Sequence, residues 1–206
     1  MTDLCVCNKG VGFAIVASLT ATVALTTTAQ GVGLDIPTSG ANCATISVLP
    51  FSDTGDTTGL DCAGNAINDD FSATCPYSGS TSPDVFYNII ATPGLDAADG
   101  TVDGLARIDV ITCGSVMDTQ LYILDSSFAE VACVDDACTL ANGDPYAAQI
   151  LDVGLDIANP AGPEYFIALD GWAGAAGVYQ ITVDVTAGPC VVPPFGDPDA
   201  NCGSDE

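Results

Sequence analysis

The chain has 206 residues, 48% of them hydrophobic, so it can bury the core of one domain of ordinary size. Its 27 acidic residues stand against only Lys9 and Arg107, and it has no histidine. This balance excludes nucleic-acid binding, which needs basic side chains against phosphates, and it makes divalent cations the natural partners. The missing histidine excludes Ser-His-Asp catalysis and His-ligated zinc.

The N-terminal part of the sequence is typical of a targeting segment. Residues 11–29 carry no charge, and small residues precede Gln30. This pattern predicts a signal peptide over residues 1–29 that is cleaved after Ala29. Two alternatives keep the apolar run: a membrane anchor, or a pilin-type signal cleaved after Gly10 that leaves residues 11–29 as an assembly helix. Membrane contact is expected only through this run.

The remaining cysteines support export. Beyond the predicted signal, none of them shows the CxxC spacing of zinc ribbons or thioredoxin-type redox motifs. An even set of eight in an exported chain predicts up to four disulfides. A short Cys133–Cys138 bridge is one expected pair. The eight are Cys43, Cys62, Cys75, Cys113, Cys133, Cys138, Cys190 and Cys202.

Short stretches with a period of two dominate the chain from about residue 44. In residues 178–185, for example, Tyr179, Ile181 and Val183 fall on one face and polar residues on the other. Clusters of Gly, Pro, Asn and Asp separate the stretches, and no helix is expected after residue 30. The sequence therefore predicts an all-β, jelly-roll-like antiparallel β-sandwich of about eight strands. The expected strands are 44–49, 84–90, 105–112, 119–125, 128–133, 148–153, 164–170 and 178–185.

Two segments fall outside this pattern. Residues 50–82 are predicted to form a long polar loop that is functional or tied by its two cysteines. Residues 188–206 are Pro-rich and end in acid, which indicates a C-terminal extension. The predicted organisation is thus a single β-sandwich domain over residues 30–187 between a signal and an extension.

Four motifs in the second half resemble a known family. They are PDVFYNIIA (83–91), CGSVMDTQLYILD (113–125), CVDDAC (133–138) and GPEYFIALDGWAGAAGVYQITVDV (162–185). In this order and spacing they resemble the bacterial pre-peptidase C-terminal domain, over roughly residues 83–186. The resemblance implies a compact jelly-roll sandwich of exported proteins, which assists secretion or binds a substrate or surface.

Three carboxylates are the candidate metal ligands. Asp118, Asp135 and Asp136 lie at predicted strand ends, and in a sandwich such ends can meet in one cluster of loops. Carboxylates that meet without Lys or Arg attract Ca²⁺, which takes 6–8 oxygen ligands. The alternative is that Asp118 accepts hydrogen bonds from its own turn, through the Thr119 and Gln120 amides, while the other two face water.

Other polar residues give weaker patterns. Trp172 lies on a Gly-rich turn, where it either caps the sandwich edge or stacks on a sugar or peptide. A glycosidase-type pair would involve Glu130 and Glu164. The remaining acids are expected to be solvated, because the order of an EF-hand loop is absent. They are Asp53, Asp56, Asp61, Asp69 and Asp70 with Asn65 and Asn68, and Asp197 and Asp199 with Asn201 in the tail.

The sequence therefore predicts a secreted or cell-surface, non-catalytic binding or structural module, stabilised by calcium at Asp118, Asp135 and Asp136. Its expected partners are an extracellular protein, a polysaccharide or other copies of itself. The first alternative is a pilin-like extracellular filament subunit that retains residues 11–29. The second is a carboxylate-dependent hydrolase.

Overall fold

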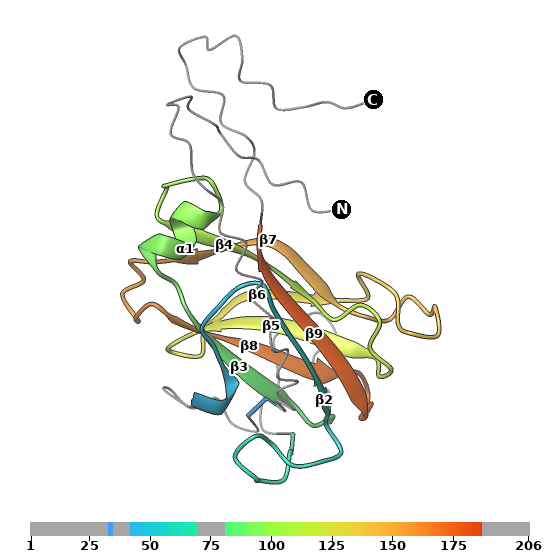
Figure 1. Cartoon of the computed structure of the whole chain (residues 1–206). Coiled ribbons are helices and arrows are strands. Elements are labelled where there is room, and N and C mark those ends of the chain that lie inside the picture. The colour runs from blue at the N-terminus through green and yellow to red at the C-terminus, as the bar shows by residue number, and fades with distance from the viewer. Residues whose placement is uncertain (1–32, 35–41, 70–80, 187–206) are drawn as a thin grey trace, which may run out of the picture. The chain divides into compact units, whose positions relative to one another are not determined.

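The computed structural model describes residues 33–34, 42–69 and 81–186 (Figure 1). The predictions for residues 1–29 and 188–206 lie outside these described residues. Residues 29–188 form one compact unit. Within the described part of the chain, no helix combines the length and the apolar character that crossing a membrane requires.

Nine strands form two sheets among the described residues. A five-stranded sheet has the order β1-β3-β8-β5-β6, and a four-stranded sheet has the order β2-β9-β4-β7 (Figure 1). All neighbours pair antiparallel except β1 and β3. The strands are β1 (Thr45–Ile46), β2 (Phe51–Asp56), β3 (Val85–Ile90), β4 (Leu105–Ile111), β5 (Thr119–Asp125), β6 (Glu130–Asp135), β7 (Gln149–Asp156), β8 (Glu164–Gly171) and β9 (Val178–Val185).

The strand order confirms the predicted all-β sandwich. Strands β2, β9, β4 and β7 lie over β3, β8, β5 and β6, which is the arrangement of a jelly roll. The chain changes sheet at most connections, and β5 and β6 are the consecutive pair that stays in one sheet. The open end of that hairpin, where β5 begins and β6 ends, carries the candidate metal ligands.

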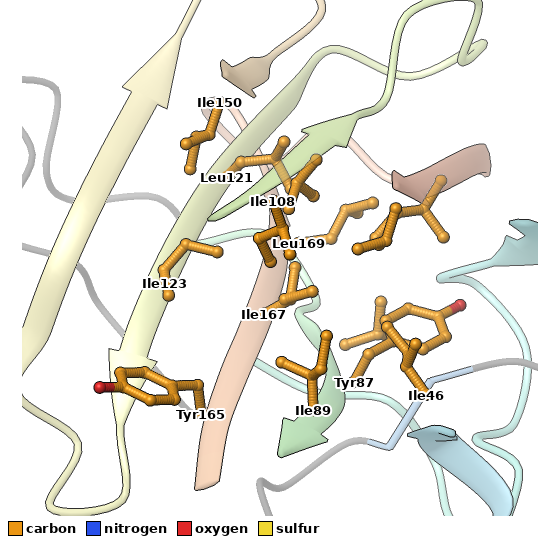
Figure 2. Packing of buried hydrophobic residues seen from close by; sticks show 14 of the residues in the cluster. Ile46, Tyr87, Ile89, Ile108, Leu121, Ile123, Ile150, Tyr165, Ile167 and Leu169 are labelled. Atoms are coloured by element: carbon orange, nitrogen blue, oxygen red, sulfur yellow. The ribbon is translucent and has the colours of Figure 1, made fainter. Parts of the chain in front are cut away.

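The core fills the space between the two sheets. In β9, Tyr179, Ile181 and Val183 are fully buried and alternate with exposed residues, as the period-two pattern predicts. Figure 2 shows Ile108 and Ile150 of the four-stranded sheet close to the residues of the other sheet. Burying each side chain of this size stabilises the fold by about 1.5–3 kcal/mol.

The central strands of the five-stranded sheet are buried on both faces. Their second face forms a smaller cluster, against which the ring of Phe128 stacks on Phe166 with centroids 5.4 Å apart. This burial explains why β3, β5 and β8 read as nearly continuous apolar runs. The cluster consists of Phe86, Tyr122, Leu124, Phe166 and Ala168.

Two predictions about secondary structure were wrong. Strand β2 lies inside the segment 50–82 that was predicted to be a loop, and helix α1 (Pro93–Ala98) lies where no helix was expected. Strand β2 pairs along its whole length with β9. This pairing, rather than the local sequence pattern, therefore determines that these residues form a strand. Helix α1 begins after Thr92, whose hydroxyl accepts a hydrogen bond from Leu95 N at 3.2 Å.

Candidate metal centre

The β5–β6 hairpin brings the predicted metal ligands together. Asp118 immediately precedes β5, Asp135 is the last residue of β6, and Asp136 follows it. The two strands are antiparallel, with Gln120 opposite Asp135, so the start of β5 lies beside the end of β6. The predicted convergence of Asp118, Asp135 and Asp136 is therefore a property of the strand register.

The carboxylates lie at the separation that a shared cation requires. One oxygen from each of the three side chains lies within 4.8 Å of the others. The Oδ1 atoms of Asp118 and Asp135 are buried and accept no hydrogen bond. The other oxygen of Asp135 accepts one from Gln120 Nε2 at 3.0 Å. Asp136 is exposed and adopts φ 52°, a left-handed conformation that Asp tolerates better than most residues.

Burial and repulsion by neighbouring carboxylates both raise the pKa of Asp118 and of Asp136. Burial, followed by the charges of Asp135 and Asp136, raises the pKa of Asp118 to about 6. Burial and the charge of Asp135 also raise the pKa of Asp136. Across the described residues the single basic side chain, Arg107, pairs instead with Asp103 at 3.0 Å and Asp152 at 3.6 Å. The three carboxylates thus form a compact site of uncompensated negative charge.

The alternative prediction, that the Asp118 side chain accepts a hydrogen bond from the Thr119 amide, is not supported. The amide of Thr119 donates to the carbonyl of Tyr146 at 3.1 Å, and Asp118 Oδ1 accepts no hydrogen bond. The backbone carbonyl of Asp118 accepts from Trp172 N at 3.4 Å. A cation would give the buried oxygen of Asp118 the electrostatic partner that its own turn does not provide.

No protein-family model matches this chain, and comparison with curated proteins found no match. The resemblance to the pre-peptidase C-terminal domain stays a prediction that rests on the four motifs.

A disulfide joins the two loops that carry the carboxylates. Cys113, in the loop before Asp118, is bonded to Cys138, which lies two residues after Asp136. The predicted Cys133–Cys138 bridge is wrong, and Cys133 is disulfide-bonded to a different cysteine. Cys133 lies within β6 opposite Tyr122, whereas Cys138 lies beyond the turn beside the β4–β5 loop. The prediction of disulfides is confirmed by this bridge and by Cys43–Cys62.

Trp172 contacts the backbone of one candidate ligand, Asp118. It follows β8 directly, at the start of the turn toward β9, and its side chain is 39% exposed. The hydrogen bond that its backbone N–H donates to the carbonyl of Asp118 holds the β8–β9 turn against the start of β5. The residue therefore contributes to positioning the loop of Asp118 and also presents part of its side chain to solvent.

The other acids proposed from the sequence do not form a comparable group. Asp56 accepts hydrogen bonds from Thr58, and Asp61 from Ala63 and Asn65, as in ordinary turns. Asp53 and Asp61 are both buried rather than solvated, so the prediction was wrong for these two residues. Asp70 and the tail acids lie outside the described residues. In the part of the chain that the structure describes, Asp118, Asp135 and Asp136 are the one group of three with metal-ligand spacing.

Sequence reasoning missed an open groove beside β1 and α1. Its volume is about 470 Å³, and its lining residues include no charged side chain. They come from β1 and the segment after it, from β3, from α1 and from the end of β9, so no continuous motif marks the groove. The apolar lining includes Ile46, Val48, Leu49, Ile90, Leu95 and Val185.

Proposed function

We propose that this domain is a non-catalytic binding or structural module of the cell exterior, stabilised by calcium bound at Asp118, Asp135 and Asp136. The convergence of these carboxylates, with two buried oxygens that accept no hydrogen bond, carries the proposal. Calcium fits because it takes carboxylate, carbonyl and water oxygens in flexible numbers, so protein side chains need not complete the shell. Bound calcium would replace repulsion within the cluster by attraction.

The first experiment measures thermal unfolding of the full chain with calcium, magnesium or sodium chloride at equal ionic strength. Calcium at about 100 times its dissociation constant stabilises a folded protein by about 2.7 kcal/mol. Equal ionic strength is essential because general screening also stabilises a chain of net charge −25. We expect a rise in Tm that is specific to calcium.

A matched pair of variants assigns the effect to the site. Asp135→Asn with Asp136→Asn removes two ligands, whereas Asp69→Asn with Asp184→Asn removes the same charge at exposed positions. The control should keep the calcium-specific rise in Tm, and the ligand variant should lose it. If both variants respond to calcium as the wild type does, these carboxylates are not the site.

A carboxylate-dependent hydrolase is the second candidate. One observation favours it: a pKa of about 6 places Asp118 in the range of a general acid. This candidate predicts turnover on a panel of glycans or peptides, lost in Asp118→Asn. It also predicts inhibition by calcium, because the ion would hold Asp118 ionised.

Export is supported by the two disulfides of the described residues, which persist in oxidising compartments. The partners we propose are an extracellular protein, a polysaccharide or further copies of the chain. Sequencing the N-terminus of the native protein separates the remaining alternatives. Gln30 supports a secreted module, Val11 a pilin-like filament subunit, and Met1 a membrane anchor.

A further inference from the structure

The Cys113–Cys138 disulfide joins the loop that carries Asp118 to the loop that begins with Asp136. Asp118 belongs to the loop 112–118 between β4 and β5, and Asp136 begins the loop 136–148 between β6 and β7. The disulfide is the covalent link between these two loops. Along the chain it is five residues from Asp118 and two from Asp136.

Hydrogen bonds also connect the loops, but they are individually weak. Gly114 N donates to Thr139 O at 2.8 Å, and Ala141 N donates to Ser115 O at 2.9 Å. Each such bond contributes modestly on balance, because water replaces it when it opens. Three carboxylates within 4.8 Å repel one another and favour that opening when no cation is bound. The covalent link is the connection that this repulsion cannot open.

We infer that the Cys113–Cys138 disulfide makes calcium affinity depend on oxidation. This inference rests on the proposed calcium site. In the oxidised protein the two loops are held together and the ligands are preorganised. In the reduced protein, part of the binding free energy is used to bring the loops together. Calcium binding is therefore strong only after the bridge has formed, as it does in an oxidising compartment.

The redox step is an ordinary thiol–disulfide exchange. One thiolate of a dithiol such as dithiothreitol attacks a sulfur of the Cys113–Cys138 bond and forms a mixed disulfide. Its second thiol then displaces the remaining cysteine. The protein gains two thiols, and the reductant becomes a cyclic disulfide. Two electrons and two protons pass from the dithiol to the protein.

The direct test measures calcium binding to the full chain by titration calorimetry. Cys113→Ser with Cys138→Ser removes the bridge between the loops, and Cys43→Ser with Cys62→Ser removes a bridge between other segments. We expect the first variant to bind calcium about tenfold or more weakly, a typical size for coupling between sites. We expect the second to bind as the wild type does. Equal affinities in all three proteins would overturn the inference.

A second test uses only the wild-type protein, so it can be carried out even if the serine variant does not fold. Because coupling is reciprocal, calcium must favour the oxidised bridge by the same factor by which the bridge favours calcium. Wild-type protein is equilibrated in a dithiol redox buffer with and without calcium, alkylated and analysed by peptide mass spectrometry. Calcium should protect Cys113 and Cys138 from reduction and leave Cys43 and Cys62 unaffected. If the wild type binds calcium but calcium does not protect Cys113 and Cys138, the redox inference is overturned and the calcium site stands. If the wild type binds no calcium, both proposals are overturned.

Discussion

The hydroxyl oxygens of Tyr87 and Tyr179 lie 2.8 Å apart between the two sheets. Tyr87 comes from β3 and Tyr179 from β9, so this contact joins the sheets through their side chains. Tyr87 also donates to Asp53 Oδ2 at 2.8 Å, and Tyr179 accepts from Gly33 N at 3.1 Å. Burial raises the pKa of both phenols, that of Tyr179 to about 12, which keeps them protonated as donors.

Replacing Tyr87 by Phe should destabilise the domain by about 1–3 kcal/mol, because a hydroxyl that bonds a buried carboxylate is lost. Tyr146→Phe is the control, since Tyr146 is 46% exposed and its change should be nearly neutral. Urea denaturation at pH 7 measures both. An equal midpoint for the two variants would show that the buried network contributes nothing to stability.

Gly55 is required beneath the ring of Tyr179. The two residues are register partners in β2 and β9, and a Cβ on Gly55 would overlap the Tyr179 ring and hydroxyl. Gly55→Ala should therefore cost about 1–3 kcal/mol by overpacking. Gly94→Ala is the control: Gly94 lies in α1, a Cβ there would meet only Thr92 Oγ1 at an ordinary contact distance of 3.8 Å, and alanine favours a helix by about 0.5–1 kcal/mol. The urea midpoints of the two variants should shift in opposite directions relative to the wild type.

The sequence predicted the strands whose burial follows a local pattern and missed the elements that depend on distant partners. Strand β9 was predicted with its observed limits because its apolar residues alternate. Strand β2, with the sequence FSDTGD, has almost no apolar pattern. Its buried residues are Asp53 and Gly55, and these face Tyr87 of the opposite sheet and Tyr179 of the neighbouring strand. Such an arrangement cannot be seen in a local window of sequence.

The candidate site shows the same division. That Asp118 and Asp135 would meet follows from their places at the start of one strand and the end of the next in a hairpin, whose strands the period-two pattern reveals. The partner of Cys138 does not follow, because Cys113 reaches it only through the packing of one connecting loop on another. Spacing along the chain favoured Cys133 as the partner of Cys138. The side chain of a cysteine within a strand, however, points to one face of the sheet, and that face determines which cysteine it can reach.

Asp99 should contribute stability that requires its charge. It is 1% exposed and accepts hydrogen bonds from the amide and hydroxyl of Thr101 and from Arg107 N. Burial opposes the charge, but these hydrogen bonds lower the pKa of Asp99 below its ordinary value. Asp99→Asn should destabilise the domain by about 1.5–3 kcal/mol at pH 7, because an amide cannot accept all three bonds.

The pH dependence checks the origin of this effect. A lowered pKa gives stability that is present above the ordinary pKa of Asp and is lost as pH falls through the lower, folded value. The difference between wild type and Asp99→Asn should therefore shrink on acidification below about pH 4. Denaturation at a series of pH values measures it. A difference that is constant with pH would mean that packing, rather than charge, explains the loss.

Asp118 should show the opposite behaviour. Its pKa is raised to about 6 by burial and by Asp135 and Asp136, so the folded state binds a proton that the unfolded state releases near pH 4. Stability therefore falls as pH rises from about 4 to 6 and stays lower above that range. Without calcium, Asp118→Asn should be more stable than the wild type at pH 7, by about 1 kcal/mol after solvent screening of a partly exposed group. At pH 4 the two proteins should be similar.

Calcium should reverse this order. It binds the ionised carboxylate, so above pH 6 the wild type should become the more stable protein, while the Tm of Asp118→Asn should change much less. Calorimetric Tm values with calcium or with a chelator, from pH 4 to 8, measure both effects. A wild type that remains less stable than Asp118→Asn in saturating calcium would mean that repulsion among the carboxylates is not relieved by the ion.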